Sequence, residues 1–438
     1  MANHKIKKIF PSTRKERVSW YFYDWANSAF YTTVITVFLG PYLTGITKAA
    51  ANSDGMINII GLHIFYGSFF PYLVSLSVIL QVLILPLIGA IADFTNKKKL
   101  LLGIFTYLGA FSTMGLYFLK ESGFIFGGLL FILANLCFGA ASVIYNSFLS
   151  DIAYEHQRDE VSSTGWAIGY IGGGLCLAIN LVIFAYSDNL KIDKSLAVRI
   201  NLALAGVWWG LFSLIPMKFL RKSESSNSAT LNIISVGYKQ LSLTFKDMLR
   251  YKSTLLFLIA YLLYNDGVQS VIVIASQFGK DELGIEISTL TQIILMVQFV
   301  GFLGSYLFNY LAKLMKTKTV ILINLLIWSV AIFYAYMFLK DTAGFWLLSF
   351  VIGLVLGGIQ ALSRSLFSNL IPTGKTSEYF AFYEISDKGT SWLGPLIFGL
   401  SLQLSGSYRI AILSLLILLI SGAVILFFTK INELKTDM

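Results

Sequence analysis

The stretch GAIADFTNKKKLL, residues 89–101, decides the fold class. It ends one apolar run and begins the next, and Lys97, Lys98 and Lys99 lie between the two runs. Lysine clusters in short loops mark the cytoplasmic side of membrane proteins. The stretch therefore predicts two membrane-spanning helices joined by a short cytoplasmic loop.

The composition of the whole chain agrees with this interpretation. Of its 438 residues, 56% are hydrophobic and only 13% are charged, whereas soluble proteins carry about 25% charged residues. The net charge of +10 could suit a nucleic-acid binder. However, the basic residues lie in short loops between apolar runs, so we expect a lipid bilayer as partner and no nucleic acid. Cys137 and Cys176 lie inside apolar runs and match no metal or redox spacing, so we expect no metal and no cofactor.

Apolar runs long enough to cross about 30 Å of hydrocarbon recur along the chain. They predict twelve helices, near residues 20–46, 66–92, 100–119, 124–149, 164–187, 199–217, 253–279, 287–312, 319–339, 345–370, 385–407 and 409–429. An even number of spans places both termini on one side of the membrane. Most of the 33 Lys and Arg residues lie in the loops of that side, so we expect both termini in the cytoplasm.

The longest predicted cytoplasmic connection, residues 218–252, divides the helices six and six. The predicted domains are an N-terminal bundle (1–217), this linker and a C-terminal bundle (253–438). The linker begins with the polar run RKSESSNS, which is typical of flexible segments. Apolar residues at helical spacing then predict an amphipathic helix on the membrane surface, with a solvated loop as the alternative. These residues are Leu231, Ile234, Tyr238, Leu241, Phe245 and Met248.

The two halves share short polar patterns at corresponding positions. YDWANS (23–28) in helix 1 matches YNDGVQS (264–270) in helix 7. SFLSDIA (147–153) at the end of helix 4 matches SLFSNLIP (365–372) at the end of helix 10. The matching helices have the same orientation, as expected for parallel repeats. The fold class predicted from the residues is an all-α membrane protein with two pseudo-symmetric six-helix bundles.

The motif at 89–101 resembles the loop between helices 2 and 3 of the major facilitator superfamily. YDWANSAF (23–30), NDGVQS (265–270) and GGIQALSRSLFSNLIP (357–372) are similar to the vacuole effluxer branch of that superfamily. The resemblance covers residues 15 to 430. It implies two rocking six-helix bundles. Fungal members of this branch export amino acids from the vacuole, and the bacterial relatives have largely unassigned substrates.

Polar side chains within the spans should face the bundle interior, because polar groups that face lipid are costly. They share faces on helices 1, 4, 7 and 10, which line the central cavity in the superfamily. The predicted substrate-binding residues are Asn27, Tyr31, Asn135, Asn146, Tyr264, Asp266, Gln269, Gln360 and Arg364.

Asp266 and Asp24 are the predicted coupling residues. Asp266 lies near the membrane midplane, on one face with Gln269 and Ser270, where a lone carboxylate is costly unless it is protonated or paired. It is expected to bind a coupling proton or the substrate, with a static hydrogen bond between helices as the alternative. Asp24 lies near the cytoplasmic boundary and is expected to be a gate or proton exit. A helix-start residue bound to backbone N–H groups is the alternative. We expect the aromatic residues around it to form an interfacial belt rather than a binding cage.

Gly89 and Asp93 are predicted gating residues. The glycine permits close helix approach. In the superfamily the aspartate contacts the start of helix 11, here near residues 386–388, and latches the outward-facing state. The second half has Phe308 at the position of the aspartate, so any latch should be asymmetric.

Arg364, Asp387 and Lys388 also lie in the cytoplasmic third of their predicted helices. They predict an ion-pair network that gates the cytoplasmic side. As the alternative, Arg364 binds a substrate carboxylate, which a guanidinium does bidentately.

These features favour a secondary active transporter of a small polar solute, with an amino acid-like substrate favoured and a proton or sodium ion as coupling ion. No phosphate-binding loop is present, so ATP is not the expected driver. No hydrolase or metalloprotease motif is present, so an enzyme is not expected. A transporter-like sensor without net transport is the alternative. We expect a monomer in a bacterial inner membrane.

Overall fold

The computed structural model describes residues 13–59, 61–94, 98–120, 123–153, 158–189, 191–221, 251–368 and 392–431, together with residues 249, 370 and 383. Within these ranges the chain is almost entirely helical, and the only sheet is a two-stranded hairpin. Eleven helices in this part of the chain are long and apolar enough to span a membrane. The prediction of a multi-pass, helical membrane protein is confirmed.

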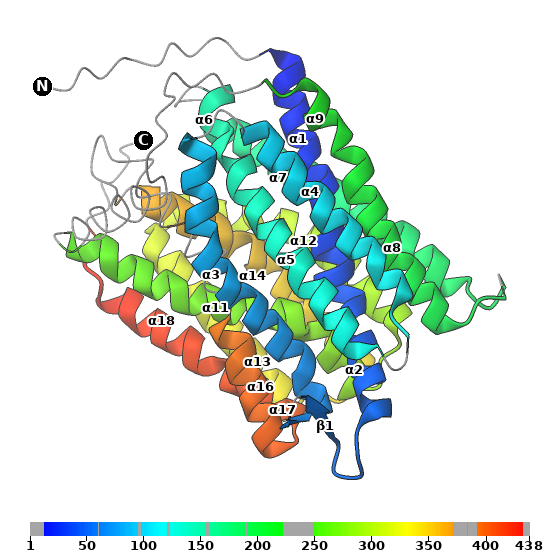
Figure 1. The fold of residues 1–438 in the computed structure, drawn as a ribbon. Coiled ribbons are helices and arrows are strands. Elements are labelled where there is room, and N and C mark those ends of the chain that lie inside the picture. The colour runs from blue at the N-terminus through cyan, green and yellow to red at the C-terminus, as the bar shows by residue number, and fades with distance from the viewer. Residues whose placement is uncertain are drawn as a thin grey trace, which may run out of the picture.

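The N-terminal half supplies six of these spans (Figure 1). The first span is continuous and consists of α1 (Arg14–Ala29), η1 (Phe30–Phe38) and α2 (Leu39–Ala50). The others are formed by α3 (Phe69–Phe94), α4 (Lys98–Gly115) with η3 (Leu116–Phe118), α5 (Phe124–Ser147), α7 (Arg158–Ala185), and α8 (Lys194–Phe212) with α9 (Leu214–Phe219). The short helix α6 (Leu149–Ile152) follows α5. The first span extends past its predicted bounds of 20–46 at both ends.

The C-terminal half supplies the other five spans and one shorter apolar helix. The spans are formed by α11 (Lys252–Asp281), α12 (Ile287–Leu314), α13 (Thr317–Met337), α14 (Thr342–Ser368), and α17 (Tyr408–Ser414) with α18 (Leu416–Phe428). The shorter helix is α16 (Leu393–Ser405), which lies within the predicted span 385–407. The predicted count of twelve full spans is therefore not reached by the described residues. The predicted amphipathic helix lies outside them.

The middle of the first span is a π-helix, η1, in which each N–H bonds five residues back instead of four. The N–H of Leu39, for example, bonds to the carbonyl of Val34. Pro41 follows closely and has no N–H, so the carbonyl of Val37 loses its α-helical partner. π-Helices are rare, and they occur frequently at functional sites.

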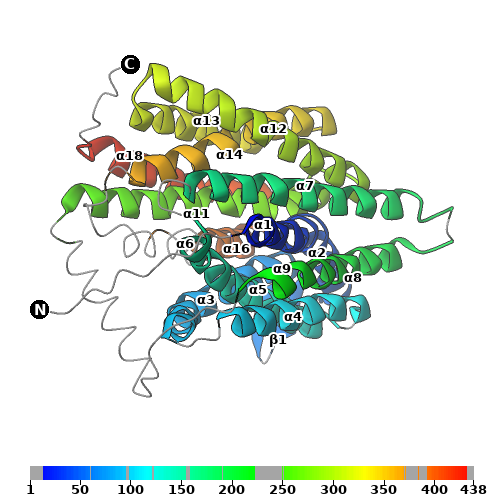
Figure 2. The same cartoon turned by 90° about the horizontal axis from the view of Figure 1, so that it is seen from above.

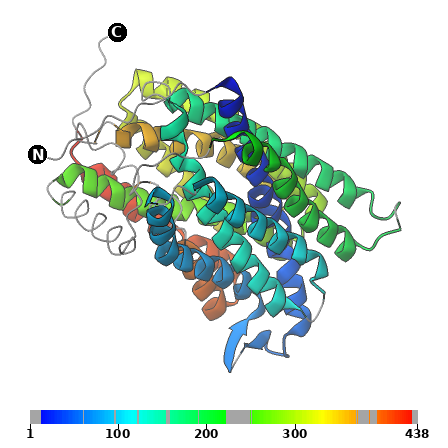
Figure 3. The same cartoon turned by 45° about the horizontal axis from the view of Figure 1, so that its top comes forward.

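A β-hairpin that the sequence did not predict separates the first span from α3. Strands β1 (Met56–Ile59) and β2 (Leu62–Phe65) pair antiparallel, with Ile59 opposite Leu62. Gly61 takes a positive φ of 83° in the turn, and its N–H donates to Asn58 Oδ1 at 2.9 Å. Figures 1 and 3 show the hairpin projecting from one end of the bundle. The short 3-10 helix η2 (Tyr66–Ser68) connects it to α3.

The described helices surround three clusters of buried side chains, one in the C-terminal half and two mainly in the N-terminal half. Seen from above, α12, α13 and α14 lie on one side, α3, α4, α5 and α8 lie on the other, and α1, α7 and α11 lie between them (Figure 2). Trp328 and Phe257 belong to the first of these clusters, whereas Trp209 and Trp20 belong to the other two, and the cluster of Trp209 also includes Val273 of α11. We call the end that carries the hairpin the hairpin end. The opposite end, where α1 begins and α18 ends, is the terminal end.

Candidate functional site

A hydrogen bond joins the two halves near the middle of the described bundle. Tyr31 in η1 donates its hydroxyl to Oε1 of Gln269 in α11 at 2.9 Å. Both side chains are half-buried, whereas their neighbours Thr32, Val268 and Ser270 are buried. The structure thus brings together two predicted substrate-binding residues from helices 1 and 7.

Asp24 connects three helices of the N-terminal half. It accepts a hydrogen bond from the hydroxyl of Tyr145 in α5 at 2.8 Å. It also lies against α7, because a Cβ at Gly165 would be 2.9 Å from Asp24 Oδ2. The alternative that Asp24 caps its own helix is wrong, because α1 begins at Arg14 and Thr13 is its cap.

The aromatic residues beside Asp24 pack inside the protein. Trp20 and Tyr23 are only 2% and 0% exposed. Both rings stack on Tyr145, with centroids 4.4 and 4.7 Å from the Tyr145 centroid. A belt at the lipid interface would leave such rings exposed, so the belt interpretation is wrong for these two residues. The stacked rings fill the space between them, which favours a packing role over a cage.

The predicted residues of helix 4 have different environments. Asn135 donates from Nδ2 to Oγ of Ser77 in α3 at 2.7 Å, and its backbone carbonyl accepts from Gln81 Nε2 at 2.6 Å. Asn135 therefore joins α5 to α3 within the N-terminal half. Asn146 is half-buried near the end of α5, and Asn27 is buried in α1.

Asp266 is fully buried and binds the N-terminus of another helix. Its Oδ2 accepts a hydrogen bond from the backbone N–H of Gly394, at the start of α16, at 3.1 Å. Ser270 donates to the backbone carbonyl of Asp266 at 2.6 Å and lies 3.4 Å from its Oδ1. Helix N-termini stabilise negative charge through their free N–H groups and their dipole. These contacts support the alternative interpretation, a static hydrogen bond between helices.

Gly394 allows this contact because α11 and α16 approach too closely for a side chain. A Cβ at Gly394 would overlap Oγ of Ser270 and lie 3.1 Å from the carbonyl oxygen of Asp266. Asp266 and Ser270 therefore face α16, whereas Gln269 faces η1. The three residues predicted to share one face contact two different neighbours.

Tyr264 joins α11 to α14 within the C-terminal half. Its hydroxyl lies 2.6 Å from Oγ of Ser363. Gln360 is half-buried on the same helix, α14. Arg364 also belongs to α14, but its side chain lies outside the described part of the structure. Its predicted role stays a prediction.

The predicted latch falls largely outside the described residues. Gly89 and Asp93 belong to α3, but their surroundings are not among the described contacts. Asp387 and Lys388 lie in an undescribed stretch before α16. Phe308, at the corresponding position of the second half, is buried against Gly358 of α14.

A set of hydrogen bonds that the sequence did not predict joins the halves at the hairpin end. Gln277 in α11 donates from Nε2 to the carbonyl of Gly67 of the N-terminal half at 2.7 Å. The same group lies 3.2 Å from the hydroxyl of Tyr408 within the C-terminal half. Lys280 donates from Nζ to the carbonyl of Pro41 at 2.8 Å. Two further hydrogen bonds, each 2.8 Å long, reach α16. Ser68 in η2 donates to the carbonyl of Gly399, and Tyr72 in α3 donates to Oε1 of Gln403.

One feature of the sequence could have indicated the hydrogen bonds at the hairpin end. Gln277 follows Ser270 by two helical turns and so extends the polar face of helix 7 toward the hairpin end. The partners gave no signal, because several of them are backbone carbonyls.

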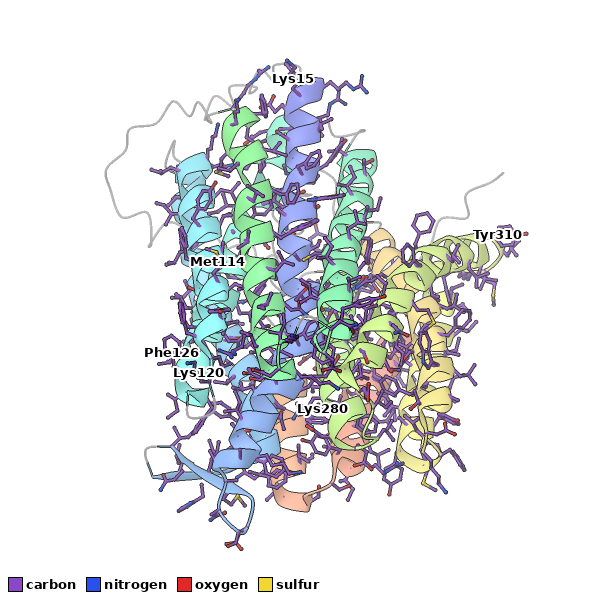
Figure 4. All side chains as sticks on the ribbon, turned by 90° about the vertical axis from the view of Figure 1, so that its right-hand side faces the viewer. Lys15, Met114, Lys120, Phe126, Lys280 and Tyr310 are labelled. Carbon is purple, nitrogen blue, oxygen red and sulfur yellow. The ribbon has the colours of Figure 1, made fainter. Side chains whose placement is uncertain are left out.

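The halves diverge toward the terminal end. Figure 4 shows Lys280 where the two halves meet, whereas Lys15 at the start of α1 and Tyr310 near the end of α12 lie far apart. Within the described residues, hydrogen bonds thus join the halves at the hairpin end, and α1 and α12 lie far apart at the terminal end.

Comparison with known proteins agrees with this architecture. The family model described as "Vacuole effluxer Atg22 like" matches residues 12–438. A relative in Bacillus subtilis (strain 168), the uncharacterized MFS-type transporter YxiO, is 32% identical over 97% of this chain and 96% of its own length. Autophagy-related protein 22-2 of Neosartorya fischeri is 26% identical over 91% of this chain and 85% of its own length.

Solved structures support the same fold. The nucleoside transporter NupG matches with a TM-score of 0.62 and 16% identity over 94% of this chain and 96% of its own. A D-xylose–proton symporter matches with a TM-score of 0.67 and 13% identity over 95% and 96% of the two chains. At these identities the likeness concerns the fold alone. Taken with the family model and the bacterial relative, it shows that this chain belongs to the vacuole effluxer Atg22-like family of the major facilitator superfamily of membrane transporters.

Proposed function

We propose that the protein is a secondary active transporter that moves a small polar, amino acid-like solute by alternating access. The proposal rests on the difference between the two ends: hydrogen bonds join the halves at the hairpin end, and the helices diverge at the terminal end. A transporter of two rocking halves passes through such a state when its site faces one side. With the basic loops in the cytoplasm, this state faces the cytoplasm.

The side chains between the halves favour a polar solute. Tyr31 and Gln269 offer a hydroxyl and an amide, and these groups donate and accept hydrogen bonds. A zwitterion presents both a carboxylate and an ammonium group to such a pair. Membership of a vacuole effluxer family, whose fungal members the sequence resemblance links to amino-acid export, supports an amino acid-like solute.

We further propose that protons drive transport and that Asp24 carries the coupling proton. Asp24 is half-buried, lies two helical turns before Tyr31 on the same face, and is on the side of the terminal end. Asp266 is less accessible, because it is fully buried and bound to the N–H of Gly394. A proton reaches Asp266 only after α11 and α16 separate.

Uptake of radiolabelled amino acids into proteoliposomes tests the proposal. We expect accumulation under an imposed pH gradient, which a protonophore abolishes and a sodium gradient does not replace. Asp24→Asn should keep exchange but lose accumulation, because the amide keeps the shape of the carboxyl group and does not titrate. Asp188→Asn, at an exposed site, is the matched control and should behave as the wild type. Absence of exchange of every amino acid would contradict the proposed substrate class.

A further inference from the structure

The bond between Tyr31 and Gln269 is the innermost hydrogen bond between the halves in the described part of the chain. Tyr31 lies near the middle of the first span, Arg14–Ala50, and Gln269 lies in the middle part of α11. The other described hydrogen bonds between the halves lie at the hairpin end. A solute that enters from the terminal end therefore reaches this bond before it reaches the others.

The two side chains are accessible in an otherwise buried part of their helices. Phe30 and Thr32 are 0% and 6% exposed on either side of Tyr31, and Val268 and Ser270 are 0% and 1% exposed on either side of Gln269. Tyr31 and Gln269 themselves are only half-buried. A residue that served only to pack the halves together would be covered like its neighbours.

The direction of the hydrogen bond leaves groups for a ligand. Tyr31 donates to the amide oxygen, so the amide NH2 group of Gln269 keeps its two N–H donors. A solute carboxylate or amide oxygen can take the hydroxyl proton of Tyr31 and an N–H of Gln269 together. A solute without such an acceptor cannot.

We propose that the solute replaces the hydrogen bond between Tyr31 and Gln269, and that the loss of this bond loosens the closed hairpin end. This inference rests on the proposed transport function. It adds the contact through which solute binding would change the conformation of the hairpin end. A ligand shifts a conformational equilibrium only through its different interaction with the two states. Competition for this bond supplies that difference, because the bond links the halves in the closed state.

The backbone at Tyr31 supports a special role for this position. The π-helix η1 begins one residue earlier, at Phe30. The hydroxyl of Thr36 donates to the carbonyl of Tyr31 at 3.0 Å, across the five-residue step of a π-turn. η1 is also packed against α11 and α12 of the other half. Movement of Tyr31 is therefore transmitted through a segment that touches both halves.

Thiol labelling at the hairpin end measures the predicted loosening. Ser68 is fully buried and faces the carbonyl of Gly399 across the interface, so Ser68→Cys reports opening when Cys137 and Cys176 are replaced by alanine. In this reporter protein, Tyr31→Phe should speed the reaction of the introduced thiol with an impermeant maleimide about 2- to 10-fold, because the loss of one hydrogen bond has an effect of that size.

Tyr42→Phe is the matched control for this experiment. It removes the same atom from the same span, but the hydroxyl of Tyr42 bonds to Ser195 and to the carbonyl of Leu119, both in the N-terminal half. Its labelling rate should equal that of the unsubstituted reporter.

The same labelling experiment is repeated in the presence of solute, with a mixture of the common amino acids as the probe. We expect the mixture to speed labelling when Tyr31 is present and to add nothing in Tyr31→Phe. Equal labelling of the Tyr31→Phe and Tyr42→Phe proteins would overturn the inference, as would a full response to amino acids in Tyr31→Phe. Either result leaves proteoliposome exchange intact, whereas failure of the transport proposal appears as absence of that exchange.

Discussion

Replacement of Asp266 separates a structural role from a role in energy coupling. The carboxylate holds the N–H of Gly394 at 3.1 Å inside the fully buried contact of α11 with α16. Asp266→Ala leaves that donor unpaired, which costs about 1–3 kcal/mol for a buried group. Asp266→Asn keeps an oxygen acceptor and loses only the charge, whose interaction with a helix N-terminus contributes about 0.3–2 kcal/mol. We expect the order of stability Asp, then Asn, then Ala.

Unfolding of the purified protein in mixed detergent micelles measures this order. Asp341→Ala is the matched control, because Asp341 accepts from the N–H of Gly344 at 2.7 Å at the start of α14 but is exposed. Water can replace an exposed cap, so we expect a smaller loss at Asp341 than at Asp266. If Asp266→Ala were as stable as the wild type, the capping role would be refuted.

Transport by the same variants tests the coupling alternative. If Asp266 is a cap, Asp266→Asn should accumulate solute at a rate close to that of the wild type. Loss of accumulation with intact exchange and intact stability would instead identify Asp266 as the proton-binding residue. The two roles thus predict opposite results for one substitution.

Three further predictions concern the ends of the molecule. Gly67→Ala should destabilise the closed hairpin end, because the new Cβ would lie 2.6 Å from the hydroxyl of Tyr408; unchanged thiol labelling at that end would contradict this. Cysteine at Lys191 should react with an impermeant reagent applied outside cells, and cysteine at Lys316 should not; the reverse pattern would overturn the proposed orientation. Asp93→Asn should favour the inward-facing state if Asp93 forms the latch, and an outward-facing structure with this aspartate in solvent would exclude it.

The sequence predicted the membrane spans well, because charge-free apolar runs of this length rarely occur outside membrane-spanning helices. It also selected Tyr31 and Gln269, whose polar side chains stand out in apolar helices. It did not reveal that Asp266 and Gln269 face different neighbours, because helical spacing places both on one broad face. The π-helix η1 follows no recognisable residue pattern and so left no signal.

The unpredicted contacts share a physical cause. Asp266, Gln277, Lys280 and Ser68 bind backbone groups of other elements, an N–H in the first case and carbonyls in the others. Every residue carries such groups, so residue types do not reveal which one is used. The polar side chain can be found from the sequence, but its partner depends on how closely the helices approach.

The β-hairpin offers an epitope for antibodies and other engineered binders. It is anchored at Ile57, which is 2% exposed, while Leu62 near its turn is 66% exposed. It leads into η2, in which the carbonyl of Gly67 accepts a hydrogen bond from Gln277 of the other half. A binder raised against the hairpin and its neighbours on the C-terminal half would hold one conformation. It would also add ordered mass outside the membrane. Electron cryomicroscopy needs such mass to align particle images, and small transporters have little of their own.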